Sequence, residues 1–279
     1  MLLKTKLVSI AANLVRRLPR RPALCTVASE YLNGYHGDND MRPGENGEYA
    51  LADALGPGSR IIFDVGANVG EWSLRMAHMS PLAKVHSFEP STTTFKILED
   101  RTKSLRDRIV INHCGVGATN TSGVLISYAA ASELGSFHKL EGVNMDALGD
   151  AITETVQLIA LDRYCSEIGI TAIDFMKVDV EGHEVDVLQG ARGLLGKGAI
   201  KYVQFEYHAT WIYSRSQIRD VFALLANGPY QIYKLLGGGR FLRLRRYSQA
   251  IETYQYANYL LVAGDNPLPG TSIEAEFQV

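Results

Sequence analysis

From residue 59 onward, short runs of β-branched and aromatic residues alternate with stretches of helical periodicity. This alternation predicts a parallel sheet with helices on both faces, because consecutive parallel strands need a crossover connection, which is usually a helix. The expected strands are residues 60–65, 84–88, 109–112, 173–178, 202–205, 231–235 and 257–262. The expected helices are residues 71–78, 92–104, 161–168, 184–195 and 217–227. The sequence therefore predicts one α/β domain at residues 59–263 with a seven-stranded, mostly parallel sheet.

Three segments fall outside this alternation and define the expected domain boundaries. Residues 1–58 combine an N-terminal helix with a connector rich in Gly, Pro, Asn and Asp, in which a short helix is expected at residues 49–55. Residues 118–155 are a less regular insertion with one extra strand expected at residues 123–128. Insertions of this kind usually shape the entrance for a substrate. Residues 264–279 are expected to be a mobile tail.

Basic residues are concentrated at the N-terminus. Of the 28 lysines and arginines, six lie within residues 1–29, which contain no acidic residue. The remaining 250 residues carry 22 basic and 30 acidic side chains. Because a negatively charged body repels phosphate backbones, a nucleic-acid partner is not expected.

Residues 1–18 have the pattern of a basic amphipathic helix that ends at Pro19 and Pro22. Its apolar face consists of Leu3, Leu7, Ile10, Leu14 and Leu18. Such a helix can lie on an anionic membrane surface, or it can pack on the body through its leucines while its cations stay solvated. The sequence leaves both interpretations open.

Cysteine usage and hydropathy indicate an intracellular protein. Cys25, Cys114 and Cys165 are widely spaced, with no CxxC pair and no histidine at ligand spacing, which favours a reducing compartment and argues against structural zinc. No run of 18 apolar residues is present to span a membrane, and no clear cleavage site follows the first apolar stretch. We expect a cytoplasmic protein that is peripheral at the membrane surface if residues 1–18 bind lipid.

The most informative motif is the glycine-rich turn that follows the first strand. Gly66 and Gly70 let the backbone turn sharply into a helix and let a ligand approach where a Cβ atom would block it. The helix N-terminus then offers free N–H groups. Asp64, at the carboxyl end of the strand, would repel a pyrophosphate but can accept hydrogen bonds from an ammonium group. The turn favours a cationic ligand such as S-adenosylmethionine over NAD, although a tight connection alone would also need glycines.

A second acidic residue ends the next strand. Glu89 follows residues 84–88 and lies 25 residues after Asp64. A carboxylate has two acceptor oxygens, which match the two hydroxyl groups of a ribose. We therefore expect Glu89 to bind the ribose of the cofactor, although an acidic residue at a strand end can also be merely solvated.

The third motif places charges in a central strand. Lys177 and Asp179 share one face of residues 173–178, and Glu181 follows them. The next strand ends in Glu206 and His208. Because isolated charges inside a sheet are costly, each needs a partner or a ligand. The five side chains are interpreted as a polar floor beside the reactive methyl group; the alternative is an ion pair of Lys177 with Asp179 or Glu206, with solvated acids around it.

Together, the motifs at residues 63–71, 88–90 and 176–184 resemble the FkbM family of S-adenosylmethionine-dependent methyltransferases. The resemblance extends from about residue 47 to residue 206. It implies a Rossmann-like class I methyltransferase fold with a seven-stranded sheet, S-adenosylmethionine as cofactor, and a small-molecule acceptor. Family members mostly methylate hydroxyl groups of sugars or secondary metabolites.

The resemblance also implies roles for individual residues. It places Asp64, Gly66, Asn68 and Gly70 around the methionine portion of the cofactor and Glu89 on its ribose. Asn112 would lie near the adenine, and Glu48 would face the cofactor. Residues 114–117 depart from the family pattern, so the adenine contacts are the least specific part of the resemblance.

Methyl transfer from a sulfonium is an in-line displacement, so the enzyme mainly aligns the reactants and removes a proton. We expect Asp179 or Glu181 to hold or deprotonate the acceptor hydroxyl, with His208 as the alternative base and Lys177 and Glu206 beside them. No metal is assigned, and a divalent cation on Asp179, Glu181 and Glu206 is the open alternative. Two other classes remain: an NAD-binding oxidoreductase, although the turn lacks the full GxGxxG spacing, and a non-catalytic, membrane-tethered binding module.

Overall fold

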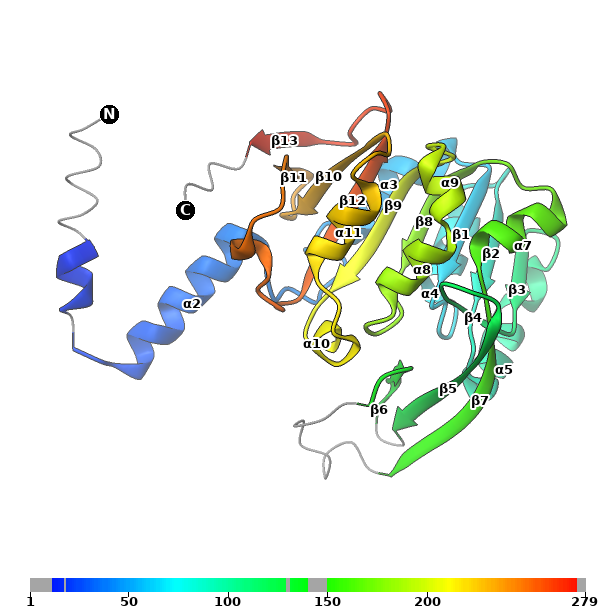
Figure 1. Ribbon diagram of the computed structural model, residues 1–279, viewed down its shortest axis with the longest axis horizontal. Coiled ribbons are helices and arrows are strands. Elements are labelled where there is room, and N and C mark those ends of the chain that lie inside the picture. Colours follow the sequence, from blue (N-terminus) through cyan, green and yellow to red (C-terminus); the bar gives the residue numbers. More distant parts are fainter. Residues whose placement is uncertain (1–11, 18, 129–130, 140–149, 275–279) are drawn as a thin grey trace.

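The computed structural model describes residues 12–17, 19–128, 131–139 and 150–274 (Figure 1). Its centre is a nine-stranded sheet in the order β13-β11-β10-β12-β9-β8-β1-β2-β3. The predicted strands correspond to β1 (Ile61–Val65), β2 (Lys84–Phe88), β3 (Ile109–Asn112), β8 (Ile173–Val178), β9 (Ile200–Tyr207), β10 (Tyr230–Leu235) and β12 (Ala257–Ala263). Two strands that the sequence analysis did not predict, β11 (Arg240–Leu244) and the edge strand β13 (Thr271–Glu274), extend the sheet beyond β10. The α/β class is confirmed, while the strand number rises from seven to nine.

The half of the sheet that holds the sequence motifs is parallel. β1 pairs in parallel with β2 and with β8, and β8 pairs in parallel with β9. This register sets Asp64 beside Ser87 on one side and Lys177 on the other. The carboxyl ends of these strands meet at one edge, where open α/β sheets bind ligands. On the other side of β9, the pairs β9–β12, β12–β10 and β10–β11 are antiparallel.

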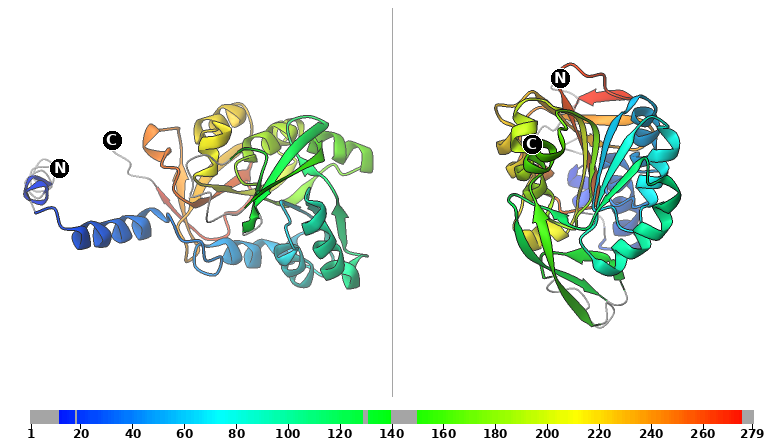
Figure 2. Two further views of the ribbon diagram at one scale, coloured as in Figure 1. Left: turned by 90° about the horizontal axis from the view of Figure 1, so that it is seen from below. Right: turned by 90° about the vertical axis from the view of Figure 1, so that its right-hand side faces the viewer.

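Helices cover both faces of the sheet, as predicted (Figure 2). One face carries α3 (Glu48–Leu55), α4 (Glu71–Met79) and α5 (Thr92–Thr102). The other carries α7 (Leu161–Ile168), α8 (Glu184–Gly190), α9 (Arg192–Gly196) and α11 (Ile218–Leu225), while α10 (Thr210–Ser214) follows β9. Trp72 and Met76 of α4 belong to the apolar cluster of the first face, and Val187 and Leu188 of α8 to that of the second.

The predicted helix at residues 184–195 is divided into α8 and α9. The division falls at Ala191, directly after Gly190, which has low helix propensity. A Cβ atom on Gly190 would lie 2.1 Å from the carbonyl oxygen of Gly117, so only glycine fits this close approach. The interruption therefore coincides with a backbone contact to the start of the insertion.

The insertion folds into a second sheet. Its strands, in the order β4-β7-β5-β6, are β4 (Gly115–Val116), β7 (Ala151–Ile159), β5 (Thr121–Tyr128) and β6 (Ala131–Ser136). β5 contains the one strand that was expected here, and β7 pairs with it along its length. The sequence analysis missed β7 because only two of its residues, Val156 and Leu158, are buried, so the strand shows little alternation of apolar and polar residues. Figure 1 shows this sheet beyond the carboxyl ends of β1 and β8.

The N-terminal region differs from expectation. Most of the expected helix at residues 1–18 lies outside the described residues, of which 12–16 are helical. Pro22 was expected to end a helix, but it begins α2 (Pro22–His36), because a first-turn proline lacks only an N–H group that has no helical partner. α2 contains no buried residue and extends away from the body (Figures 1 and 2). None of the helices within the described ranges is long and apolar enough to cross a membrane.

The segment after β12 corrects the expectation of a mobile tail. β13 pairs in parallel with β11, so residues 271–274 belong to the main sheet. The hydroxyl of Tyr202 also donates a hydrogen bond to the carbonyl oxygen of Pro267 over 2.7 Å. These backbone and side-chain contacts attach the segment to the body.

Candidate active site

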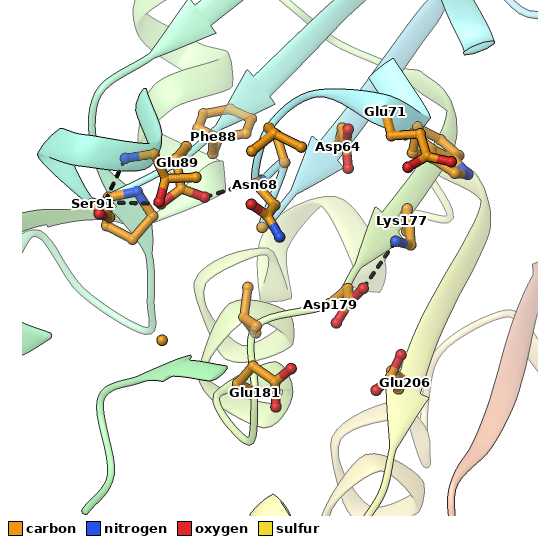
Figure 3. Close-up of a pocket in the computed structure, with 18 of the residues that line it drawn as sticks. Asp64, Asn68, Glu71, Phe88, Glu89, Ser91, Lys177, Asp179, Glu181 and Glu206 are labelled. Atoms are coloured by element: carbon orange, nitrogen blue, oxygen red, sulfur yellow. Dashed lines mark hydrogen bonds and ion pairs between the residues drawn. The ribbon is translucent and has the colours of Figure 1, made fainter. Parts of the chain in front are cut away.

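A cavity of about 410 Å³ lies at the carboxyl ends of β1, β2, β8 and β9 and is bounded on one side by the second sheet. Nine of the twelve predicted site residues line it: Glu48, Asp64, Gly66, Asn68, Glu89, Lys177, Asp179, Glu181 and Glu206. Figure 3 shows Glu89 and Asn68 at one end and Asp64, Lys177, Asp179 and Glu206 toward the other. The residues of the three sequence motifs therefore meet in one space.

The glycine-rich turn is fixed to both neighbouring strands. The N–H groups of Gly66 and Ala67 donate to the carbonyl oxygen of Phe88 over 3.1 and 2.9 Å. Gly66 has φ of 85°, and a Cβ atom there would lie 1.7 Å from the carbonyl oxygen of Asp179. Asn68 also has a positive φ, of 47°. The turn needs glycine at position 66 because the backbone of the segment after β8 crosses directly over it.

Asp64 is a buried carboxylate with a free acceptor atom. Its Oδ2 accepts a hydrogen bond from the hydroxyl of Ser73, which also lies 2.7 Å from the Ser87 hydroxyl. Its Oδ1 is buried and has no hydrogen-bond partner among the described residues. Burial raises the pKa of Asp64 to about 6, against the opposing effect of the Lys177 ammonium. A buried acceptor without a partner is costly, so this atom is suited to a cationic or hydrogen-bond-donating ligand.

Glu89 is held rigidly at the other end of the cavity. The N–H of Asn68 donates to its Oε2 over 3.0 Å, and the N–H of Ser91 donates to its Oε1 over 2.8 Å (Figure 3). Burial raises the pKa of Glu89 to about 7, although these two hydrogen bonds lower it. Each carboxylate oxygen can accept a second hydrogen bond. Glu89 can therefore accept from two adjacent hydroxyl groups at once.

Lys177 forms the ion pair that was the alternative to a catalytic role. Its Nζ lies 2.9 Å from Asp179 Oδ2 and 3.4 Å from Glu48 Oε1. Burial lowers the pKa of Lys177, but the carboxylates of Asp179, Glu48 and Asp64 outweigh it and hold the pKa well above its ordinary value. Lys177 thus stays charged and orients the two carboxylates beside the cavity. Glu48 reaches the cavity through this pair.

Glu181, Glu206 and His208 form a compact cluster. The Nε2 atom of His208 lies 3.3 Å from Glu181 Oε2 and 3.2 Å from Glu206 Oε1. Burial raises the pKa of Glu181, and burial together with Asp179 and Glu181 raises the pKa of Glu206 well above its ordinary value. Burial lowers the pKa of His208, but the adjacent Glu181 outweighs it and the net shift is upward. An ionised carboxylate is a stronger base when its pKa is raised, so Glu181 is suited to accepting a proton.

The same cluster has the composition of a metal site. The ligand atoms of Glu181, Glu206 and His208 all lie within 4.8 Å of one another. This set differs from the one considered for a divalent cation in the sequence, because His208 takes the place of Asp179. His208 is not among the lining residues of the cavity, but it contacts Glu181 and Glu206, which are.

Two predicted cofactor residues are not brought to the cavity. Gly70 begins α4 with φ of 82°, and a Cβ atom there would lie 2.5 Å from Leu98 Cδ1, so this glycine serves the packing of α5. The side-chain amide of Asn112 donates to the carbonyl oxygens of Ser87 and Val110 over 3.1 and 3.3 Å. Neither residue is among the lining residues, so the adenine contacts stay unassigned.

Several lining residues were missed. Trp72, Tyr49, Tyr256 and Phe137 are cavity residues that no motif singled out. Trp72 follows the glycine turn directly and could have been found from its position at the start of α4. Tyr256 and Phe137 come from distant parts of the chain, and no local pattern places them beside the turn.

The chain matches the family model described as the methyltransferase FkbM domain over residues 64–232. It is similar to the 31-O-demethyl-FK506 methyltransferase FkbM of Streptomyces tacrolimicus, with 32% identity over 161 residues, 49% of this chain and 60% of that protein. It is also similar to the hexuronic acid methyltransferase AglP of Haloferax volcanii, with 26% identity over 149 residues, 53% of this chain and 56% of that protein. Each alignment thus spans less than two thirds of the relative.

Among solved structures, the chain is similar to an O-methyltransferase from Bacillus cereus in complex with SAH. The TM-score is 0.46 and the sequence identity 14%, over 88% of this chain and 93% of that one.

Proposed function

Since this chain belongs to the FkbM methyltransferase family, we propose that it transfers the methyl group of S-adenosylmethionine to a hydroxyl group of a small molecule, either a sugar or a secondary metabolite. Two relatives support this range of acceptors, because one is a 31-O-demethyl-FK506 methyltransferase and the other a hexuronic acid methyltransferase. The observation that carries the proposal is the pair of buried carboxylates, Asp64 and Glu89, at the ends of adjacent parallel strands.

The cavity residues fit the cofactor. Asp64 Oδ1 is a buried acceptor without a partner, which suits the ammonium end of a methionine group. Glu89 presents two carboxylate oxygens that suit a ribose diol, and the absence of a side chain at Gly66 leaves room for the ligand. Asn68 would hold the middle of the molecule. When bound, S-adenosylmethionine supplies an electrophilic methyl carbon.

The acceptor would bind beside Asp179 and Glu181. Asp179 is paired with Lys177, so its position is fixed and its charge is partly balanced. Glu181 Oε2 lies 3.3 Å from His208 Nε2, so Glu181 is suited to receive the hydroxyl proton and pass it to the imidazole. We assign Asp179 to orienting the hydroxyl and Glu181, with His208 behind it, to removing its proton.

Titration and transfer assays test this assignment. Glu181→Ala should still bind S-adenosylmethionine but lose turnover by about 10²- to 10⁴-fold, the usual effect of removing a general base. Asp179→Ala should also bind the cofactor but lose turnover, because the acceptor hydroxyl is no longer oriented. Asp107→Ala, on the exposed surface, is the matched control and should keep full activity. Full activity in both cavity variants would remove the assignment. Binding of NAD in place of S-adenosylmethionine would favour an oxidoreductase.

We also propose that the protein acts in the cytoplasm and contacts the membrane surface through its N-terminal region. Arg16, Arg17, Arg20 and Arg21 are exposed ahead of α2, which itself has no buried residue. Cations beside an exposed amphipathic helix favour an anionic lipid surface. Membrane binding without any methyl transfer would instead support the non-catalytic binding module.

A further inference from the structure

A second group of potential ligands lies beside the cavity, outside the carboxylate cluster. His138 Nε2 lies 3.4 Å from His183 Nδ1, and Asp186 Oδ2 lies 3.4 Å from the same nitrogen. The three ligand atoms all lie within 4.8 Å of one another. His138 follows β6 of the second sheet, whereas His183 and Asp186 belong to the first turn of α8. Two parts of the chain that are distant in sequence therefore converge on one point.

The spacing of these atoms suits a metal better than a hydrogen bond. Hydrogen bonds between nitrogen and oxygen are usually about 2.7–3.2 Å long, so the contact of His183 with Asp186 is long, and the two imidazole nitrogens of His138 and His183 are separated by the same 3.4 Å. Tetrahedral zinc with bonds of about 2.0–2.2 Å holds neighbouring ligand atoms roughly 3.3–3.6 Å apart. The two contacts of 3.4 Å have this length, and two imidazoles with one carboxylate are a usual ligand set for zinc.

The surroundings of His183 restrict solvent on its side of the group, while His138 and Asp186 are partly exposed. The ring of Phe137 lies 4.9 Å from the His183 ring, centre to centre. Gly117 packs against the far side of His183, where a Cβ atom would approach Nε2 to 3.1 Å. An apolar shell of this kind limits the exchange of ligands with water.

We propose that His138, His183 and Asp186 bind a zinc ion that joins the second sheet to the start of α8. The ion would keep Phe137, which lines the cavity, beside the turn that carries Glu181. The hydroxyl of Ser136 already donates to the carbonyl oxygen of Glu181 over 2.7 Å, so the two segments are in contact there. The site does not depend on the methyl-transfer proposal. It was not expected from the sequence, since the spacing from position 138 to 183 has no zinc signature.

The test measures metal binding by the full-length protein after removal of any affinity tag and dialysis against a chelator. Addition of Co²⁺ should give the visible absorption of a tetrahedral site and saturate at one equivalent, and Zn²⁺ should displace it. His138→Ala and Asp186→Asn should each weaken metal binding by about 100-fold or more. Substitution of residues that only hydrogen-bond to metal ligands already lowers metal affinity by about 10- to 100-fold. The exposed His78→Ala is the matched control and should bind like the wild type.

Each other outcome overturns the proposal. Failure of the wild-type protein to bind Co²⁺ or Zn²⁺ would leave an ordinary ion pair between His183 and Asp186. Equal binding by His138→Ala and the wild type would remove His138 as a ligand. Loss of binding in His208→Ala alone would place the metal at the carboxylate cluster instead. Far-ultraviolet circular dichroism confirms that each variant is folded, and the partly exposed His138 provides the variant least dependent on core packing.

Discussion

At the scale of single residues, the cavity contains carboxylates whose ionised form is disfavoured by burial. Burial raises the pKa of Asp64 to about 6 and that of Glu89 to about 7. Ionised side chains in such places destabilise the fold at neutral pH. A ligand that supplies a cation and two hydroxyl groups would offset this cost, so the instability of the free protein and its affinity for the cofactor have one origin.

Glu89 should therefore make the stability of the free protein fall as the pH rises. The pKa of Glu89 is 4.5 in the unfolded chain and about 7 in the folded protein. The stabilisation that comes from this difference is therefore complete below pH 4.5 and is lost as the pH rises through 7. A difference of that size corresponds to a loss on the order of 3 kcal/mol in the free energy of unfolding. Urea denaturation between pH 5 and pH 8 measures this slope.

The affinity for S-adenosylmethionine should change in the opposite direction, because the ribose needs the ionised carboxylate. Glu89→Gln should reduce the slope of both profiles, whatever its effect on absolute stability, and the buried Asp64 should account for part of the slope that remains. Glu99→Gln alters an exposed carboxylate of the neighbouring helix and should leave both unchanged. A wild-type stability that stays constant or rises over this range would contradict the assignment.

The sequence identifies the chemistry of these residues better than their partners. Asp64, Glu89, Lys177 and Asp179 could be predicted as site residues because each ends a recognisable strand. The pairing of Lys177 with Glu48 could not be predicted. Glu48 begins a helix on one face of the sheet, and no local sequence pattern indicates that this helix lies close to Lys177. His183 shows the same limit, because its contact with His138 arises from the folding of the insertion.

At the scale of elements, the turn between β1 and α4 is the most constrained connection near the cavity. Gly66→Ala would bring a Cβ atom within 1.7 Å of the Asp179 carbonyl oxygen, at a residue with φ of 85°. Because that obstacle is backbone, the loop after β8 would have to move. We expect a loss of about 4 kcal/mol or more in the free energy of unfolding, or no folding.

Gly58→Ala is the matched control for this prediction. Gly58 is exposed, and a Cβ atom there meets nothing within 4 Å. It should change stability by no more than about 0.5 kcal/mol. Chemical denaturation of the wild type, Gly66→Ala and Gly58→Ala measures the free energy of unfolding of each. A Gly66→Ala protein as stable as the wild type would contradict the prediction, because it would show that the loop after β8 can move without cost.

Elements with a strong local pattern could be predicted, and elements defined by pairing could not. β1, β2 and β8 are short, largely buried runs with β-branched or aromatic residues, and turn residues follow β1 and β8. β11 carries charges and β13 is short and polar, so each becomes a strand only by pairing with its neighbour. α2 was not predicted because Pro22 is compatible both with the end of one helix and with the first turn of the next.

At the scale of the whole molecule, charge and apolar surface are distributed unevenly. The acidic body contains the cavity, whereas the basic residues at the N-terminus precede an extended arm (Figure 1). The side chains of α2 that are large, apolar and exposed follow the spacing of one helix face. They are Leu24, Val27, Tyr31, Leu32 and Tyr35. An exposed apolar face beside four arginines would lie at the interface of an anionic bilayer.

Vesicle flotation tests this arrangement. The full-length protein should float with vesicles that contain phosphatidylserine and remain at the bottom with phosphatidylcholine alone. Replacing Arg16, Arg17, Arg20 and Arg21 by Gln should weaken binding by about 10³-fold, since each cation near such a surface contributes about 1 kcal/mol. Leu24→Gln combined with Val27→Gln and Tyr31→Gln should abolish flotation because the apolar face is lost.

Two further proteins complete the comparison. Deletion of residues 1–29 should also abolish flotation, whereas Leu82→Gln, which removes an equally exposed leucine from the body, should not. Methyl transfer by the deletion protein should persist, because the described cavity lining begins at Met41. If the deletion protein and the full-length protein float alike, the N-terminal region does not mediate the contact. The basic charge at the N-terminus would then serve only to solvate an arm that does not bind membranes.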